Sequence, residues 1–143
     1  MPVFDLPEWA ADELEAGRVA RLAYLDAEGA PRVLPITYAL ADGVIWNVID
    51  HKPKVQDVPA RVEWLRREPR AGICVDVYHE DWSKLAWVQL IGEVEVLDLA
   101  EDGVGLEALI DKYPQYREEP PQGPLLRLQV ERAMSWRAGD HLG

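Results

Sequence analysis

Hydrophobic and polar residues alternate along most of this chain, in runs separated by short turn sequences. Alternation with a period of two is typical of β-strands that bury one face. Asp42-Gly43 is a two-residue hairpin sequence, so the strands on either side of it should be antiparallel neighbours. Gly92 predicts a bulge within a long strand. Together these patterns predict strands over residues 18–25, 32–40, 44–49, 71–78, 85–97 and 125–136.

Three other segments, residues 4–16, 55–67 and 106–113, have the hydrophobic spacing of short amphipathic helices. Gly17 can cap the first helix, and Pro59 fits only the first turn of the second. Strands joined mainly by hairpins favour a closed sheet, because closure removes exposed strand edges. We therefore expect a mostly β protein, a six-stranded antiparallel split β-barrel with short helices, in a single domain over residues 1–143.

The chain carries a formal net charge of −11, which argues against nucleic acid or an anionic membrane as a partner. No apolar run approaches the roughly 20 residues that cross a bilayer, and the first segment is acidic rather than basic. A cytoplasmic location is the expectation. The single cysteine, Cys74, lies in an alternating apolar run, which indicates a packed thiol rather than a nucleophile.

The most informative junction is Asp50-His51-Lys52-Pro53-Lys54, between an apolar strand and a helical pattern. Lys52 and Lys54 make this turn cationic, and the start of a helix presents free N–H groups and the positive end of its dipole. In an acidic protein such a local basic patch can concentrate a small anionic ligand. The turn therefore predicts a phosphate or anion site, with a solvated loop that binds nothing as the alternative.

No other local motif assigns chemistry to side chains. The sequence contains no GxGxxG, GxxxxGK[ST], HExxH or CxxC pattern. His79-Glu80-Asp81 is more typical of a solvated loop than of a metal site, and Ser83 and Ser135 have no triad partners in the sequence. No metal is expected and no catalytic residue is assigned, which points to a bound cofactor as the carrier of any chemistry.

Short motifs in a fixed order give the chain a family resemblance. It resembles the flavin-binding split barrels of the pyridoxamine 5'-phosphate oxidase superfamily, and within them a branch of F420-dependent oxidoreductases. The motifs are Trp46-Asn47-Val48-Ile49 with the following basic turn, Glu68-Pro69-Arg70-Ala71, Asp81-Trp82-Ser83 with Trp87-Val88, Lys112-Tyr113-Pro114-Gln115-Tyr116, and Val130-Glu131-Arg132 with Ser135-Trp136.

The resemblance implies a homodimer with the deazaflavin coenzyme F420, or FMN, in a groove between subunits. The family's phosphate-binding lysine falls on Lys54, with Lys52 as a second cation. Pro35 and Thr37 would run under the ring system. By the same resemblance, the phosphate side of the groove would be lined by Val48, Ile49 and Asp50. The side of the groove, or alternatively the dimer interface, would be formed by Trp82 and Trp87.

Some positions depart from the family pattern. Trp87 stands where the pyridoxamine phosphate oxidases place a glutamine on FMN, and their Arg-His tail after the terminal tryptophan is absent. Oxidation of vitamin B6 is therefore disfavoured. Asp57 and Pro59 interrupt the helix that usually carries further basic residues, so the polyanionic tail of F420 is expected to be held weakly or not at all.

The leading hypothesis is an oxidoreductase that passes a hydride from reduced F420 to a small organic acceptor stacked on the ring. An FMN-binding protein of the pyridoxamine 5'-phosphate oxidase type is the alternative. A non-catalytic module that binds flavin or haem, and a purely structural dimer whose basic turn is only a solvated loop, are the competing hypotheses.

Overall fold

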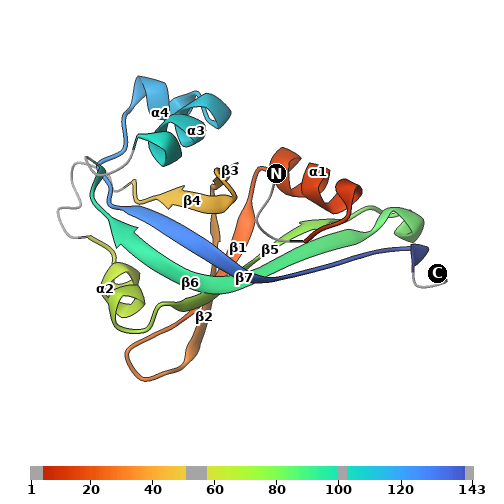
Figure 1. Ribbon diagram of the computed structural model, residues 1–143, viewed down its shortest axis with the longest axis horizontal. Coiled ribbons are helices and arrows are strands. Elements are labelled where there is room, and N and C mark those ends of the chain that lie inside the picture. The colour runs from red at the N-terminus through yellow and green to blue at the C-terminus, as the bar shows by residue number, and fades with distance from the viewer. Residues whose placement is uncertain (1–4, 51–57, 100–102, 141–143) are drawn as a thin grey trace.

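The computed structural model describes residues 5–50, 58–99 and 103–140. Within these ranges one antiparallel sheet holds seven strands in the order β2-β1-β5-β6-β7-β4-β3. The sheet curls strongly on itself (Figure 1). Its strands are β1 (Ala20–Leu25), β2 (Pro31–Ile36), β3 (Ala39–Ala41), β4 (Val44–Val48), β5 (Arg70–Val77), β6 (Ala86–Leu97) and β7 (Leu125–Arg137).

Short helices cover the curled sheet, with α2 on one side and α3 and α4 on the opposite side beside β3 and β4 (Figure 1). None of the helices in the described ranges is both long enough and apolar enough to span a membrane. The helices are α1 (Glu8–Ala16), α2 (Ala60–Arg67), α3 (Val104–Lys112) and α4 (Gln115–Glu118), and a 3-10 turn, η1, covers Trp82–Lys84.

Two hydrophobic clusters hold these layers together. The larger lies inside the curled sheet and includes Leu14 of α1, Leu65 of α2 and Leu90 of β6, all with no exposed surface. The smaller lies between the α3–α4 hairpin and the β3–β4 hairpin and includes Trp46 and Leu109. The α3–α4 hairpin is therefore part of the packed structure, and it fixes the outer face of β4.

The prediction of a mostly β antiparallel fold with short helices is confirmed, but the closed six-stranded barrel is wrong. Within the described residues the sheet has seven strands and is not closed. The count is seven rather than six because residues 32–40, predicted as one strand, divide between two partners. β2 pairs with β1, whereas β3 pairs with β4. The residues between them, Thr37 and Tyr38, belong to neither ladder and form a corner. Alternation alone cannot reveal such a change of partner.

Two local predictions are confirmed. Asp42 and Gly43 both have positive φ, 54° and 73°, as a tight hairpin turn requires, and they join the antiparallel strands β3 and β4. A register shift between β6 and β7 lies at Ile91/Gly92. A side chain at Gly92 would collide with the backbone carbonyl of Gln129, so the close approach of β7 requires glycine at this bulge.

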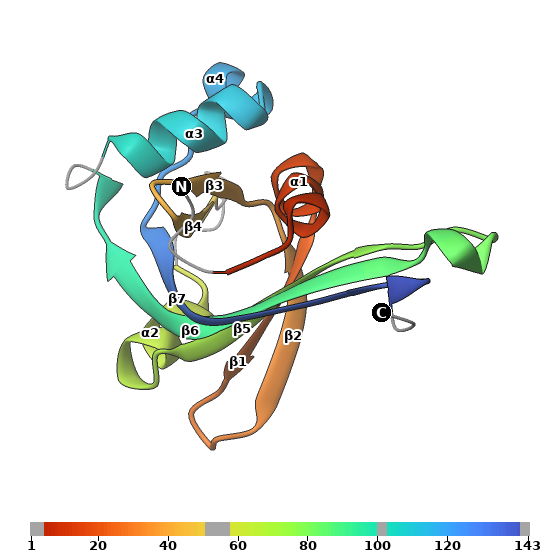
Figure 2. The same cartoon turned by 45° about the vertical axis from the view of Figure 1, so that its right-hand side comes forward.

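The far ends of β5, β6 and β7 extend beyond the curled part of the sheet (Figure 2). In this extension Trp87 of β6 pairs with Asp76 of β5 and with Trp136 of β7. Three of its aromatic residues are exposed: Tyr78 by 64%, Trp82 by 67% and Trp87 by 37%. We call this extension, residues 76–87 with Trp136, the aromatic arm.

Candidate functional site

The corner between β2 and β3 brings the two predicted ligand strands together. The side-chain amide of Asn47 in β4 donates a 2.9 Å hydrogen bond to the backbone carbonyl of Thr37. Asn47 is buried, with 6% of its surface exposed. Thr37 lies two residues before β3, whose ladder with β4 pairs Ala39 with Trp46, so this bond continues the contact of the β3–β4 hairpin. It therefore places Thr37, predicted to lie under a ring, beside Val48, predicted to line the phosphate side.

The segment Lys112-Tyr113-Pro114-Gln115-Tyr116 holds the same corner from outside. The hydroxyl oxygens of Tyr116 and Thr37 are 2.6 Å apart. The Tyr113 hydroxyl donates to the Arg18 carbonyl at 2.8 Å and accepts from the backbone N–H of Tyr38 at 3.2 Å. The sequence singled out this segment as a family motif without a role. Its tyrosines hold the corner through hydrogen bonds.

Lys112 completes this contact from the end of α3. Its ammonium lies 3.9 Å from the centroid of the Tyr38 ring and 5.6 Å from that of Tyr113. The ammonium nitrogen is buried and has no hydrogen-bond partner among the residues that the structure describes. Burial, helped by the nearby Arg18 and opposed by Glu15, lowers the pKa of Lys112 from 10.5 to about 8.

The predicted phosphate side begins where β4 ends. Val48 and Ile49 are buried, with 4% and 1% exposed, and Asp50 is exposed. Ile49 donates its backbone N–H to the Pro124 carbonyl and accepts from the Gly123 N–H, both at 3.0 Å. Lys52 and Lys54 lie outside the described residues, so their role as phosphate ligands stays a prediction.

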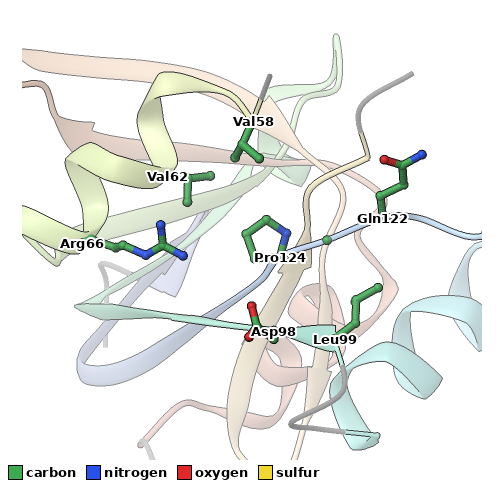
Figure 3. Close-up of a pocket in the computed structure, with 8 residues that line it drawn as sticks. Val58, Val62, Arg66, Asp98, Leu99, Gln122 and Pro124 are labelled. Atoms are coloured by element: carbon green, nitrogen blue, oxygen red, sulfur yellow. The ribbon is translucent and has the colours of Figure 1, made fainter. Parts of the chain in front are cut away.

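A pocket of about 340 Å³ borders this point (Figure 3). It lies between α2, the end of β6 and the segment that leads into β7. Gly123 and Pro124, the backbone partners of Ile49, form one of its walls. Asp50 and Val58, the described residues that flank the predicted basic turn, therefore lie at this pocket or beside it. The lining residues are Val58, Val62, Arg66, Asp98, Leu99, Gln122, Gly123 and Pro124.

Arg66 is a cationic group in this pocket that the sequence analysis did not single out. Figure 3 shows its side chain directed from α2 toward Pro124, with Asp98 nearby. Its ion pair with Glu63 is long, 3.8 Å, and half-exposed, so it binds the guanidinium only weakly. The sequence did hold a signal, because Arg66 lies four residues after Val62 and so shares its face of α2. Arg66 can bind a phosphate or carboxylate.

Pro35, Trp82 and Trp87 are placed differently. Pro35 is exposed on β2, the edge strand, where it pairs with Arg21. Trp87 lies ten residues before Leu97 on β6, and Leu97 pairs with Leu125, the partner of Val48. At about 3.3 Å per residue the separation is roughly 33 Å along the strand. The ladders also connect Trp87 to the other side of the corner, because Trp87 pairs with Asp76 of β5, Cys74 of β5 pairs with Arg21 of β1, and Ala20 of β1 pairs with Ile36 of β2. Three strand spacings of about 4.8 Å give roughly 15 Å, so within one chain Trp87 lies nearer to the Thr37 side of the corner than to Val48.

The His79-Glu80-Asp81 loop is held together by hydrogen bonds of its own. His79 Nδ1 accepts from the backbone N–H of Asp81 at 2.8 Å, and Asp81 accepts from the Ser83 hydroxyl at 2.7 Å. The hydrogen bonds that Asp81 accepts from the Ser83 hydroxyl and the Ser83 backbone N–H lower the pKa of Asp81. No group of three or more metal-binding side chains occurs in the described parts of the chain.

A comparison with protein families identifies the fold and the family together. The model of the family described as pyridoxamine 5'-phosphate oxidase matches residues 6–137. The chain therefore belongs to the pyridoxamine 5'-phosphate oxidase family, as the motifs in its sequence predict. No protein with a curated description matches the sequence.

Solved structures support the same fold. A conserved hypothetical protein from Mycobacterium tuberculosis, Rv2991, is 22% identical with a TM-score of 0.75, and the match covers 95% of this chain and 88% of that one. A heme binding protein from Mycobacterium smegmatis is 22% identical with a TM-score of 0.74, and the match covers 95% of this chain and 57% of that one. A FAD-binding protein from Mesorhizobium loti is 23% identical with a TM-score of 0.64, and the match covers 91% of this chain and 94% of that one. At these identities the likeness establishes the fold and leaves the ligand open.

Proposed function

We propose that this protein binds a flavin-type cofactor, F420 or FMN, and is a cytoplasmic oxidoreductase that reduces a small organic acceptor. The observation that carries the proposal is that the corner and the pocket are joined by one short stretch of chain. Thr37 and Asn47 meet at a corner, the chain runs on through Val48 and Ile49, and the pocket with Arg66 follows. A ligand with a flat ring at one end and an anionic group at the other fits this order of surfaces.

The residues present fit such a cofactor at its two ends. Arg66 offers a guanidinium to the phosphate end, beside the turn that carries Lys52 and Lys54. Thr37 offers a hydroxyl at the ring end. When bound, the cofactor supplies hydride transfer itself, so the protein needs only to orient the ring, exclude water and hold the acceptor against it.

A homodimer is part of the proposal. The aromatic arm exposes Tyr78, Trp82 and Trp87, and exposed aromatic patches are typical of interfaces and ring-binding surfaces. Because these side chains are exposed and lie about three strand spacings from the corner of their own chain, the arm can also contact the corner of a second copy. The groove would then have the corner of one subunit as its floor and the partner's arm as its wall.

A second candidate function is a non-catalytic module for a flavin or haem. One of the similar structures is a heme binding protein, and another is a FAD-binding protein. Turnover therefore decides between the candidates: cofactor binding without reduction of quinones, enones or biliverdin-like acceptors would favour the module.

The experiment is a fluorescence titration of the purified protein with FMN and with F420. We expect saturable binding of at least one of them, and a Lys54→Ala variant that binds it at least tenfold more weakly. Arg67→Ala is the matched control, since Arg67 is a neighbouring cation on α2 that does not line the pocket. Failure of both cofactors to bind, or equal affinity for the Lys54→Ala variant and the wild type, would refute the proposal.

A further inference from the structure

The Thr37 side chain is held by a partner 79 residues further along the chain. Its hydroxyl lies 2.6 Å from the Tyr116 hydroxyl, while its backbone carbonyl is occupied by Asn47. Tyr116 is itself fixed, because it is only 9% exposed and its ring packs edge-on against Tyr113 at 5.9 Å. Thr37 thus has a hydroxyl of defined position on the surface that the proposed function assigns to the ring.

The chemistry of the two hydroxyls decides which one donates. A phenol is a more acidic donor than an aliphatic alcohol, so Tyr116 is the preferred donor and Thr37 the preferred acceptor. The Thr37 hydroxyl has one hydrogen of its own, and this arrangement leaves that hydrogen free for another acceptor. In this arrangement Thr37 is available as a hydrogen-bond donor rather than as an acceptor.

We infer that Tyr116 is a positioning residue that sets Thr37 as the hydrogen-bond donor to a carbonyl oxygen of the bound ring. The inference rests on the proposed function and adds a specificity element to it. FMN and F420 share the dione edge of the ring system, whose carbonyl oxygens accept hydrogen bonds. A ligand with only donors at this edge would meet the Thr37 hydrogen without an acceptor, and the site would reject it.

This role separates the two ends of the ligand in an experiment. Riboflavin has the ring of FMN without its phosphate, so removing a contact to the ring should lower the affinity for riboflavin and for FMN by the same factor. Removing a contact to the phosphate should lower the affinity for FMN alone. One neutral hydrogen bond corresponds to a change in affinity of about 3- to 10-fold, which fluorescence quenching resolves.

The test is a double-mutant cycle with Tyr116→Phe, Thr37→Val and the double variant, each titrated with riboflavin and with FMN. We expect each single substitution to weaken both ligands about 3- to 10-fold, and the double variant to be no weaker than the worse single one. The absorbance bands of the bound ring should shift equally in the three variants. Tyr24→Phe, a buried tyrosine on β1 that packs on Trp64, is the matched control.

The outcomes distinguish this inference from the proposed function. If the wild type binds FMN but Tyr116→Phe binds riboflavin as tightly as the wild type, or the two substitutions are additive, the inference is wrong and the proposed function stands. An unshifted ring spectrum in Tyr116→Phe would also overturn it. If the wild type binds neither riboflavin, FMN nor F420, both are refuted.

Discussion

The side-chain amide of Asn47 joins the Thr37 carbonyl at 2.9 Å, across the corner where the chain leaves β2 and enters β3. Thr37 lies two residues before β3, and β3 pairs with β4, so this bond extends the β3–β4 hairpin into the corner. The corner is also the surface assigned to the cofactor ring, so fold and proposed site depend on the same contact.

Asn47→Ala should destabilise the protein by about 1–3 kcal/mol, because the partly buried Thr37 carbonyl loses its donor. The free energy of unfolding from urea denaturation measures the loss. Gln129→Ala, an exposed amide on β7, should change stability by less than about 0.5 kcal/mol. Equal stability of Asn47→Ala and the wild type would show that the corner does not depend on this bond.

Gly92→Ala should cost about 1–3 kcal/mol, because the added methyl group meets the backbone carbonyl of Gln129, which can move only with β7. Gly103→Ala is the matched control, since a methyl group there would have no neighbour within 4 Å among the described residues. Thermal unfolding of both variants checks the difference. A Gly92→Ala variant as stable as Gly103→Ala would mean that the bulge tolerates a side chain.

Lys112 should make stability depend on pH. Its pKa is about 8 in the folded protein and 10.5 without the fold, so between these values the unfolded chain binds more protons than the native one. The free energy of unfolding should therefore rise with pH across that window. Burial raises the pKa of Tyr38 and of Tyr113 above the usual 10.0, so near pH 10 the unfolded chain loses its tyrosine protons first, which opposes this rise at the upper end of the window.

The measurement for Lys112 is urea unfolding of the wild type and of Lys112→Met at several values between pH 7 and pH 9.5. Removing the buried ammonium should stabilise the protein at pH 7, and the advantage of the variant should shrink as the pH rises. An advantage that stays constant with pH, or a variant less stable at pH 7, would contradict the burial of a charged amine at this position.

Trp82→Ser should weaken self-association with little effect on the fold of each subunit, because Trp82 is 67% exposed in the aromatic arm. Sedimentation velocity over a range of concentrations should give a dimer for the wild type and a shift toward monomer for the variant. Val33→Ser is a suitable control, since Val33 is also 67% exposed but lies on β2, away from the arm. A wild type that remains monomeric at all concentrations would exclude the shared groove.

The sequence predicted those parts of the fold that depend on neighbours along the chain. Asp42-Gly43 specified a hairpin through its turn chemistry, and Gly92 marked the bulge in β6. The corner at Thr37–Tyr38 escaped prediction, because alternation continues through it while the strand partner changes from β1 to β4. Strand pairing is a non-local property, and nothing in residues 32–40 alone encodes it.

The candidate site divides in the same way. Thr37, Val48 and Ile49 came from a motif resemblance, and the structure places them close together, with Val48 and Ile49 buried. Tyr116 lies 79 residues from Thr37, and Arg66 reaches its pocket through the packing of α2 against β6. Neither relationship leaves a mark in local spacing. Trp82 and Trp87 lie on an exposed extension of the sheet, and the order of the strands, rather than any local spacing, sets their distance from Thr37.

The most direct measurement of the central claim is a crystal structure of the protein with FMN or F420 bound. We expect a dimer with the ring over Thr37, the phosphate beside Asp50, Lys54 and the Arg66 pocket, and the partner subunit's aromatic arm against the ring. A ligand bound elsewhere, or its phosphate more than about 6 Å from every cation of this turn and pocket, a range beyond which opposite charges exert little influence on each other, would contradict it.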